Sequence, residues 1–187
     1  MGDPPSPEGV TVGATPVVIV DDAQDEVTVD APRWAGLAEA VLAAHGHVGE
    51  LTLTFVDRDE ITALKVEHFG DPGEHPTDVL AFPIDAGAPD TTGVGPVLLG
   101  DVVVCPSVAA EQCADHAGTL DDELALLVVH GVLHVIGFDH DDDDATDRMR
   151  AVELELLERH HWGGPAPAGF RQGHDDEVAD PGTEGRR

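Results

Sequence analysis

Positive charge is scarce in this chain. Acidic residues outnumber basic ones by 38 to 9, which gives a formal net charge of -29, and Lys65 is the only lysine. A polyanion repels a phosphate backbone, because nucleic-acid binding normally gains free energy when Lys and Arg release condensed counterions. Three explanations remain compatible with a nucleic-acid substrate: the charge sits on tails and outer faces, a high salt concentration screens it, or a basic partner delivers the substrate.

Cysteines and long apolar runs are also few. Cys105 and Cys113 are the only two cysteines, too few for a disulfide framework or a thiolate metal cage, and we expect both to be buried free thiols. No apolar stretch approaches the roughly 20 residues of a membrane span, and the N-terminus lacks the basic start and apolar run of a secretory signal. We therefore expect a cytoplasmic protein with no membrane partner.

The remaining composition suits one domain with loose ends. The chain has 187 residues, of which 41% are hydrophobic, enough for a single core. Its two ends are rich in Pro, Gly and charge and carry almost no bulky apolar residues. We expect a disordered tail at 1–15, a single domain at 16–162 and a disordered acidic tail at 163–187.

Hydrophobic periodicity predicts four strands and five helices. The predicted strands are 16–20, 50–57, 78–82 and 97–105, the last with a bulge at Gly100. The predicted helices are 32–44, 59–69, 106–117, 123–136 and 144–161. The helix at 123–136 is almost wholly apolar and should lie in the centre of the fold. The order of elements predicts an α/β (α+β) fold, in which a small four-stranded mixed sheet is layered with helices.

Three histidines follow one another closely in the segment VHGVLHVIGFDHD, which spans 129–141. Two of them, His130 and His134, are four residues apart on the predicted helix, so both can reach one metal ion from the same face. Gly137 sits where the helix must end, and a glycine reversal can return His140 to the same point. Three neutral imidazoles leave a fourth position open for water, as in catalytic zinc sites. The spacing therefore predicts a site for zinc or a similar divalent ion.

The same segment has other interpretations. One histidine in an apolar helix is more often a hydrogen-bonded core residue, but three at this spacing favour a metal. Metzincin proteases share the spacing in their signature HExxHxxGxxH, yet Gly131 occupies the position of their general base, which disfavours peptide hydrolysis. Asp139 either orients an imidazole or accepts a proton beside the metal, or it only forms the turn.

The motif HGVLHVIGFDH, with PTDVLAFP upstream and LLGDVVVC between them, closely resembles the bacterial YbeY endoribonuclease family over roughly 17–161. The resemblance implies a single-strand-specific ribonuclease with one zinc ion, acting on the three-prime end of small-subunit ribosomal RNA and in ribosome quality control. It also implies that His130, His134 and His140 are the metal ligands. Ribosomal RNA is the implied substrate, and ribosomal proteins or a GTPase of ribosome assembly are the implied partners.

The chain departs from the pattern of that family in two places. Many members carry an Arg where this chain has Phe69, and the usual Ser of the PTDVLSFP-like block is Ala81. The Arg is assigned to catalysis or phosphate contact in the family. Two rival functions stay open: a metalloprotease with a different base, and a ribosome assembly factor whose histidine site only stabilises the fold. For the ribonuclease, either water or the ribose 2′-hydroxyl could be the nucleophile.

Overall fold

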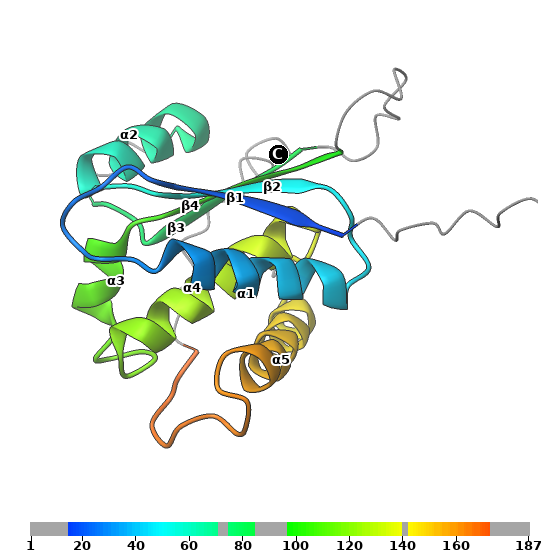
Figure 1. Ribbon diagram of the computed structural model, residues 1–187. Helices are drawn as coiled ribbons and strands as arrows, with labels where there is room; N and C mark the ends of the chain where they lie inside the picture. Colours follow the sequence, from blue (N-terminus) through cyan, green and yellow to red (C-terminus); the bar gives the residue numbers. More distant parts are fainter. Residues whose placement is uncertain (1–14, 71–74, 85–96, 140–141, 173–187) are drawn as a thin grey trace, which may run out of the picture.

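The computed structural model describes residues 15–70, 75–84, 97–139 and 142–172 (Figure 1). The strands are β1 (Val17–Asp22), β2 (Glu50–Phe55), β3 (Val79–Pro83) and β4 (Leu98–Val104). The helices are α1 (Ala31–Ala44), α2 (Arg58–Phe69), α3 (Pro106–Gln112), α4 (Leu120–Val135) and α5 (Asp143–His160). The predicted order of strands and helices is confirmed.

The four strands form one mixed sheet in the order β1-β2-β4-β3. The pairs β1–β2 and β2–β4 are parallel, whereas β3 runs antiparallel to β4. The register between β2 and β4 shifts between Glu50 and Leu51, which pair with Leu98 and Gly100. The irregularity predicted at Gly100 is therefore present in this strand, with Leu99 as the extra residue beside the glycine. Gly100 has φ 151°, and a Cβ there would lie 2.5 Å from the carbonyl oxygen of Phe82. Only glycine fits this close approach of two strands.

Helices cover both faces of the sheet. Figure 1 shows α1, α4 and α5 on one side of it and α2 on the other. Leu51, Leu53 and Phe55 of β2 are completely buried in the larger core with α1 and α4, while Thr52 and Thr54 between them remain half-buried. This alternation is the one the sequence predicts for a strand. Almost every residue of α4 is buried, which confirms its predicted central position.

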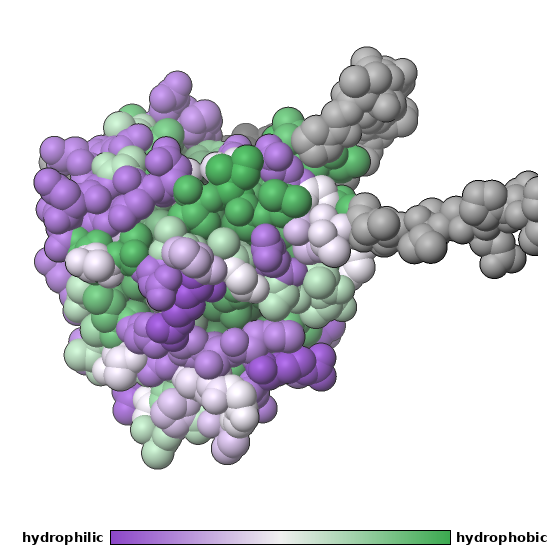
Figure 2. Space-filling model, in the orientation of Figure 1, coloured by the Kyte–Doolittle hydropathy of each residue, from purple (hydrophilic) through white to green (hydrophobic). Residues whose placement is uncertain are grey.

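The face of the sheet under α2 is only partly covered by apolar packing. A smaller core, which includes Ile61, Leu80 and Val103, lies beneath this helix. Beyond it, Val17, Ile19 and Leu98 are each about half exposed, and Figure 2 shows an apolar area over this part of the molecule. No helix in the described ranges has the length and hydrophobicity needed to cross a membrane.

Some predicted helix ends and one cysteine differ from the structure. The N-cap of α2 is Asp57, whose carboxylate accepts the Glu60 amide at 2.9 Å, two residues before the predicted boundary. Helix α3 ends at Gln112, earlier than predicted. Its N-cap is Cys105, which makes no side-chain hydrogen bond to the first turn. Cys105 is buried as expected, but Cys113 is half-buried, because it follows the shortened end of α3.

The packed part of the chain continues beyond the predicted start of the C-terminal tail at 163. The ring of Phe170 contacts that of Trp162, with centroids 4.8 Å apart, and Gln172 hydrogen-bonds to α5. An aromatic pair therefore holds a segment whose Gly and Pro content alone suggested disorder. Of the tails predicted at 1–15 and 163–187, residues 1–14 and 173–187 lie outside the described residues.

Candidate metal site

Helix α4 carries two of the predicted metal ligands and has strong signals at both ends. Its N-cap is Thr119, whose hydroxyl accepts the Asp122 amide at 3.1 Å, and acidic residues in the first turn complement the helix dipole. At the other end Gly137 has φ 94°, which confirms the predicted glycine reversal. The Phe138 amide then donates to the carbonyl of Leu133 at 3.0 Å.

The structure brings His130 and His134 together at the C-terminal part of α4. Their Nε2 atoms lie 3.0 Å apart and their ring planes are nearly perpendicular, at 78°. Two nitrogens that bind one zinc ion at tetrahedral angles are separated by about 3.3 Å. The observed separation is within a few tenths of an ångström of that value. The donor type and the spacing of both atoms therefore fit a shared divalent ion, as the sequence predicts.

The other two predicted site residues follow the helix. His140 lies outside the described residues, so its role as third ligand stays a prediction. Asp139 is described and exposed. Its suggested role beside the metal also remains a prediction.

A buried carboxylate that the sequence reasoning missed contacts the first histidine. His130 Nδ1 and Glu153 Oε1 share a hydrogen bond of 2.7 Å, and the two side chains are only 6% and 2% exposed. Glu153 lies in α5 on the same buried stripe as Met149 and Leu156. An acidic residue within the apolar stripe of this helix is the sequence signal that could have identified Glu153, because a charge is buried only where a partner satisfies it.

Gly131, next to His130, faces the sheet. A Cβ at this position would lie 2.5 Å from Cγ1 of Val102 in β4 and 3.4 Å from Cγ2 of Val79 in β3. A glutamate cannot fit there without moving the helix away from the strands. The position of the metzincin general base is therefore closed by packing, which weakens the protease interpretation beyond the missing carboxylate.

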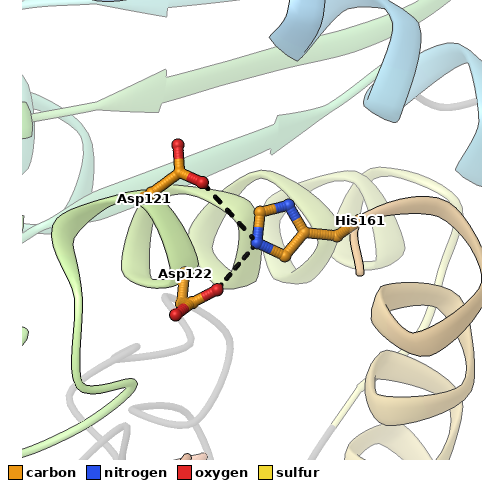
Figure 3. Close-up of side chains that lie close together, drawn as sticks. All are labelled: Asp121, Asp122 and His161. Carbon is orange, nitrogen blue, oxygen red and sulfur yellow. Dashed lines mark hydrogen bonds and ion pairs between the residues drawn. The ribbon is translucent and has the colours of Figure 1, made fainter. Parts of the chain in front are cut away.

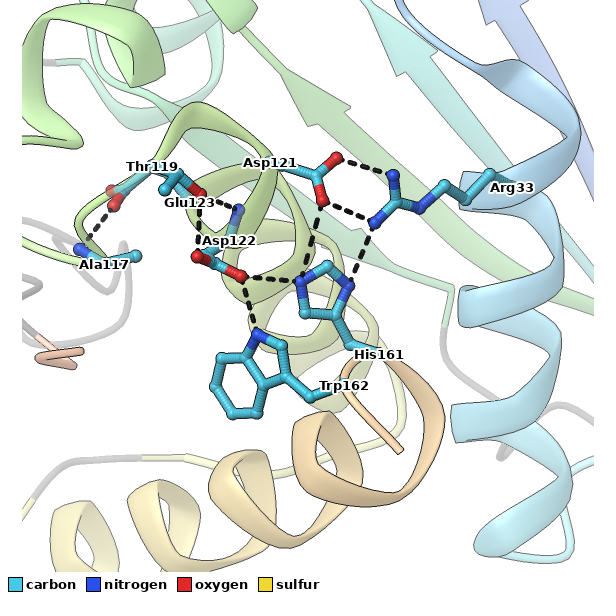
Figure 4. A network of polar contacts seen from close by, with 8 residues as sticks. All are labelled: Arg33, Ala117, Thr119, Asp121, Asp122, Glu123, His161 and Trp162. Atoms are coloured by element: carbon cyan, nitrogen blue, oxygen red, sulfur yellow. Dashed lines mark hydrogen bonds and ion pairs between the residues drawn. The ribbon is translucent and has the colours of Figure 1, made fainter. Parts of the chain in front are cut away.

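A second group of polar side chains has a spacing that could hold a cation. Asp121, Asp122 and His161 bring three ligand atoms within 4.8 Å of one another (Figure 3). However, Arg33 donates two hydrogen bonds of 2.6 Å to the Asp121 carboxylate, and its guanidinium lies 3.3 Å from His161 Nδ1 (Figure 4). The positive charge of Arg33 thus already contacts two of these three residues and would repel a cation bound among them. We interpret this group as a link between α1, α4 and the end of α5.

Within this link the carboxylate of Asp122 has three side-chain donors. They are Thr119 Oγ1 at 2.7 Å, Trp162 Nε1 at 2.6 Å and His161 Nε2 at 2.8 Å. Burial by itself raises the pKa of Asp122, but the hydrogen bonds from Thr119, Trp162 and His161 outweigh it, so the pKa is lowered overall. The ionised form of Asp122 is therefore the one that joins α4 to the residues at the end of α5.

Two positions of α2, Phe69 and Arg58, bear on how a phosphate could be bound. Phe69, which stands where the family resemblance places an Arg, lies 5.8 Å from the ring of Phe82 and belongs to the smaller core. Arg58 forms an ion pair of 2.6 Å with Glu111, and the hydrogen bond that Arg58 donates to this carboxylate raises the pKa of Arg58. The missing guanidinium is thus replaced by an aromatic packing residue in α2.

Comparisons with known proteins identify a family that this chain matches. The family described as endoribonuclease YbeY matches residues 19–161. The chain is similar to proteins named Endoribonuclease YbeY: 47% identical to that of Mycolicibacterium gilvum, over 58% of this chain and 62% of that protein. It is 43% identical to that of Beutenbergia cavernae, over 72% of this chain and 91% of that protein. The first of these alignments thus spans less than two thirds of the relative.

A solved structure supports the fold. The solution structure of TM1509 from Thermotoga maritima superposes with a TM-score of 0.50 at 20% sequence identity, covering 82% of this chain and 99% of that one. This likeness confirms the predicted mixed α/β architecture, with one sheet layered with helices.

Proposed function

The chain belongs to the endoribonuclease YbeY family, and on this premise we propose that it is a metal-dependent endoribonuclease. The observation that carries the proposal is the convergence of His130 and His134, whose Nε2 atoms lie 3.0 Å apart. His140 would complete the ligand set and leave one position for water. We propose zinc as the ion, because three neutral imidazoles suit it and zinc tolerates an open fourth position.

The protein residues would bind and orient the ion. His130 and His134 present their nitrogen atoms from one helix that is almost wholly buried, so little freedom has to be lost when the ion binds. When bound, the ion supplies Lewis acidity for a phosphoryl oxygen and lowers the pKa of a coordinated water. Asp139, at the exposed end of the motif, is placed in sequence to take a proton.

The substrate we propose is single-stranded ribosomal RNA near the three-prime end of the small subunit, processed in the cytoplasm during ribosome maturation and quality control. Most of the acidic residues lie in the described ranges, so charge confined to the tails does not explain the net charge of -29. A basic ribosomal protein or an assembly GTPase that presents the RNA would offset this repulsion.

The activity can be tested with a single-stranded RNA oligonucleotide carrying the three-prime end of small-subunit ribosomal RNA, and with its duplex as a comparison. We expect zinc-dependent cleavage of the single strand, no cleavage after chelation, and loss of cleavage in His134→Ala. His160→Ala is the matched control, because His160 is exposed at the end of α5, and it should cleave as the wild type does. Circular dichroism of each variant checks that it is folded.

The products identify the nucleophile and the alternatives. A 2′,3′-cyclic phosphate indicates attack by the ribose hydroxyl, whereas direct hydrolysis leaves linear phosphate ends. If folded His134→Ala cleaves as fast as the wild type, the metal is not catalytic and the assembly-factor interpretation stands. If a peptide library is cleaved in a zinc-dependent manner and the RNA is not, the protease interpretation replaces ours.

A further inference from the structure

We infer that Glu153 is a positioning residue for the metal site, and that Gln172, outside the range matched by the family, holds Glu153 in place. The inference rests on the proposed function, since it assigns the residues that prepare His130 to bind the ion. It adds two residues from α5 and the C-terminal segment to a site that the histidine motif alone places on α4.

The hydrogen bond between His130 and Glu153 selects one tautomer of the imidazole. His130 Nδ1 lies 2.7 Å from Glu153 Oε1, and the other oxygen of this carboxyl group accepts a hydrogen bond from Gln172. An ionised carboxylate only accepts hydrogen bonds, so our inference takes Glu153 as the acceptor and places the imidazole proton on Nδ1. The lone pair then lies on Nε2, which is the atom that faces His134. Histidine ligands of metals usually donate their other nitrogen in this way, which fixes the ring and increases its basicity.

Burial makes this contact specific. The side chains of His130 and Glu153 are 6% and 2% exposed, so water does not compete easily for either of them. Glu153 lies among Met149, Leu156 and Leu157 on the inner face of α5. An acid is costly at such a position, and its interaction with a ring that faces the candidate ion gives it a function other than packing.

The second oxygen of this carboxylate is bound from the C-terminal segment. Gln172 Nε2 donates to Glu153 Oε2 at 3.0 Å and to the backbone carbonyl of Arg150 at 2.7 Å. The two bonds tie one amide group to two consecutive turns of α5. Because both oxygens of Glu153 are engaged, its carboxylate plane cannot rotate freely, and its direction toward His130 is fixed.

Metal affinity measures this role directly. Zinc binding is measured by competition with a chromophoric chelator for the full chain, and the absorption spectrum of the Co²⁺ form reports the coordination geometry. We expect Glu153→Gln to bind zinc about 10–100-fold more weakly and to change the Co²⁺ spectrum, because an amide does not require a proton on Nδ1. Gln172→Ala should weaken zinc binding about 3–10-fold, as the milder loss of a positioning contact. Glu155→Gln, on the exposed side of the same helix, should match the wild type.

The outcomes separate this inference from the proposed function. If Glu153→Gln and Gln172→Ala bind zinc as tightly as Glu155→Gln while His134→Ala does not bind it, the metal site stands and the positioning role is wrong. If His134→Ala binds zinc as well as the wild type, both proposals fail. Should Glu153→Gln not fold, Gln172→Ala decides, because it changes a side chain near the end of the described chain. An unchanged affinity in that variant overturns the role of Gln172.

Discussion

Replacement of Gly131 by Ala should loosen the contact between α4 and the sheet. The added Cβ would lie 2.5 Å from Cγ1 of Val102, whereas carbon atoms in contact are normally about 3.5–4.0 Å apart. Val102 is completely buried and β-branched, so it cannot turn aside, and the helix must move by about 1 Å. Overpacking of this kind costs about 1–3 kcal/mol of unfolding free energy.

The size of the effect needs a control, because alanine also favours the helix over glycine by about 1 kcal/mol. Gly36 in α1 is helical and exposed, and a Cβ there meets nothing within 4 Å. Gly36→Ala should therefore stabilise the protein by up to about 1 kcal/mol, and subtraction of the two variants isolates the clash at Gly131. We expect a gap of about 1–3 kcal/mol between the two variants in urea unfolding at pH 7.

A second substitution tests the cause of the gap. Val102→Ala removes the methyl groups that the new Cβ would meet, so the double variant should be more stable than the sum of the single changes predicts, with a coupling of about 1 kcal/mol or more. Zinc affinity should also fall in Gly131→Ala, since the shift displaces His130. If Gly131→Ala is as stable as Gly36→Ala, the close approach of α4 to the sheet is not what this glycine provides.

Two further predictions concern the link between α1, α4 and the end of α5. Asp122→Asn should cost about 1–3 kcal/mol at pH 7, because hydrogen bonds to an ionised group are lost. Because the pKa of Asp122 is lowered in the folded protein, its contribution to stability is fully present above its unfolded pKa of about 3.9 and is lost as the pH falls through its folded pKa. The difference in unfolding free energy between Asp122→Asn and the wild type, measured with urea, should therefore be smaller at about pH 3 than at pH 7. An equal difference at both pH values would contradict this. Arg33→Ala should lower the unfolding free energy by less than about 1 kcal/mol, and by less still in 1 M salt, since the side chains of Arg33 and Asp121 are 42% and 51% exposed. A loss above about 2 kcal/mol that does not depend on salt would show that this ion pair behaves as a buried one.

Interactions between residues close in the sequence determined the strands, the central helix and two of the candidate ligands. The positions of all four strands, the bulge at Gly100 and the central place of α4 follow from hydrophobic periodicity and glycine, which act over a few residues. The same is true of the pair formed by His130 and His134, because a spacing of four residues on a helix already puts two side chains on one face. Helix ends were less well predicted, since several adjacent polar residues compete to cap a helix such as α2.

Tertiary structure alone decided which residues surround those histidines. Glu153 is 23 residues from His130 in the sequence, and no local periodicity relates the two; the packing of α5 against α4 brings them within 2.7 Å. The packing of α4 against β4 closes the position of Gly131 against Val102, and the C-terminal segment carries Gln172 to the carboxylate of Glu153. The sequence by itself thus determined the two donors on one helix, while their orientation depends on contacts between elements that only the folded chain places side by side.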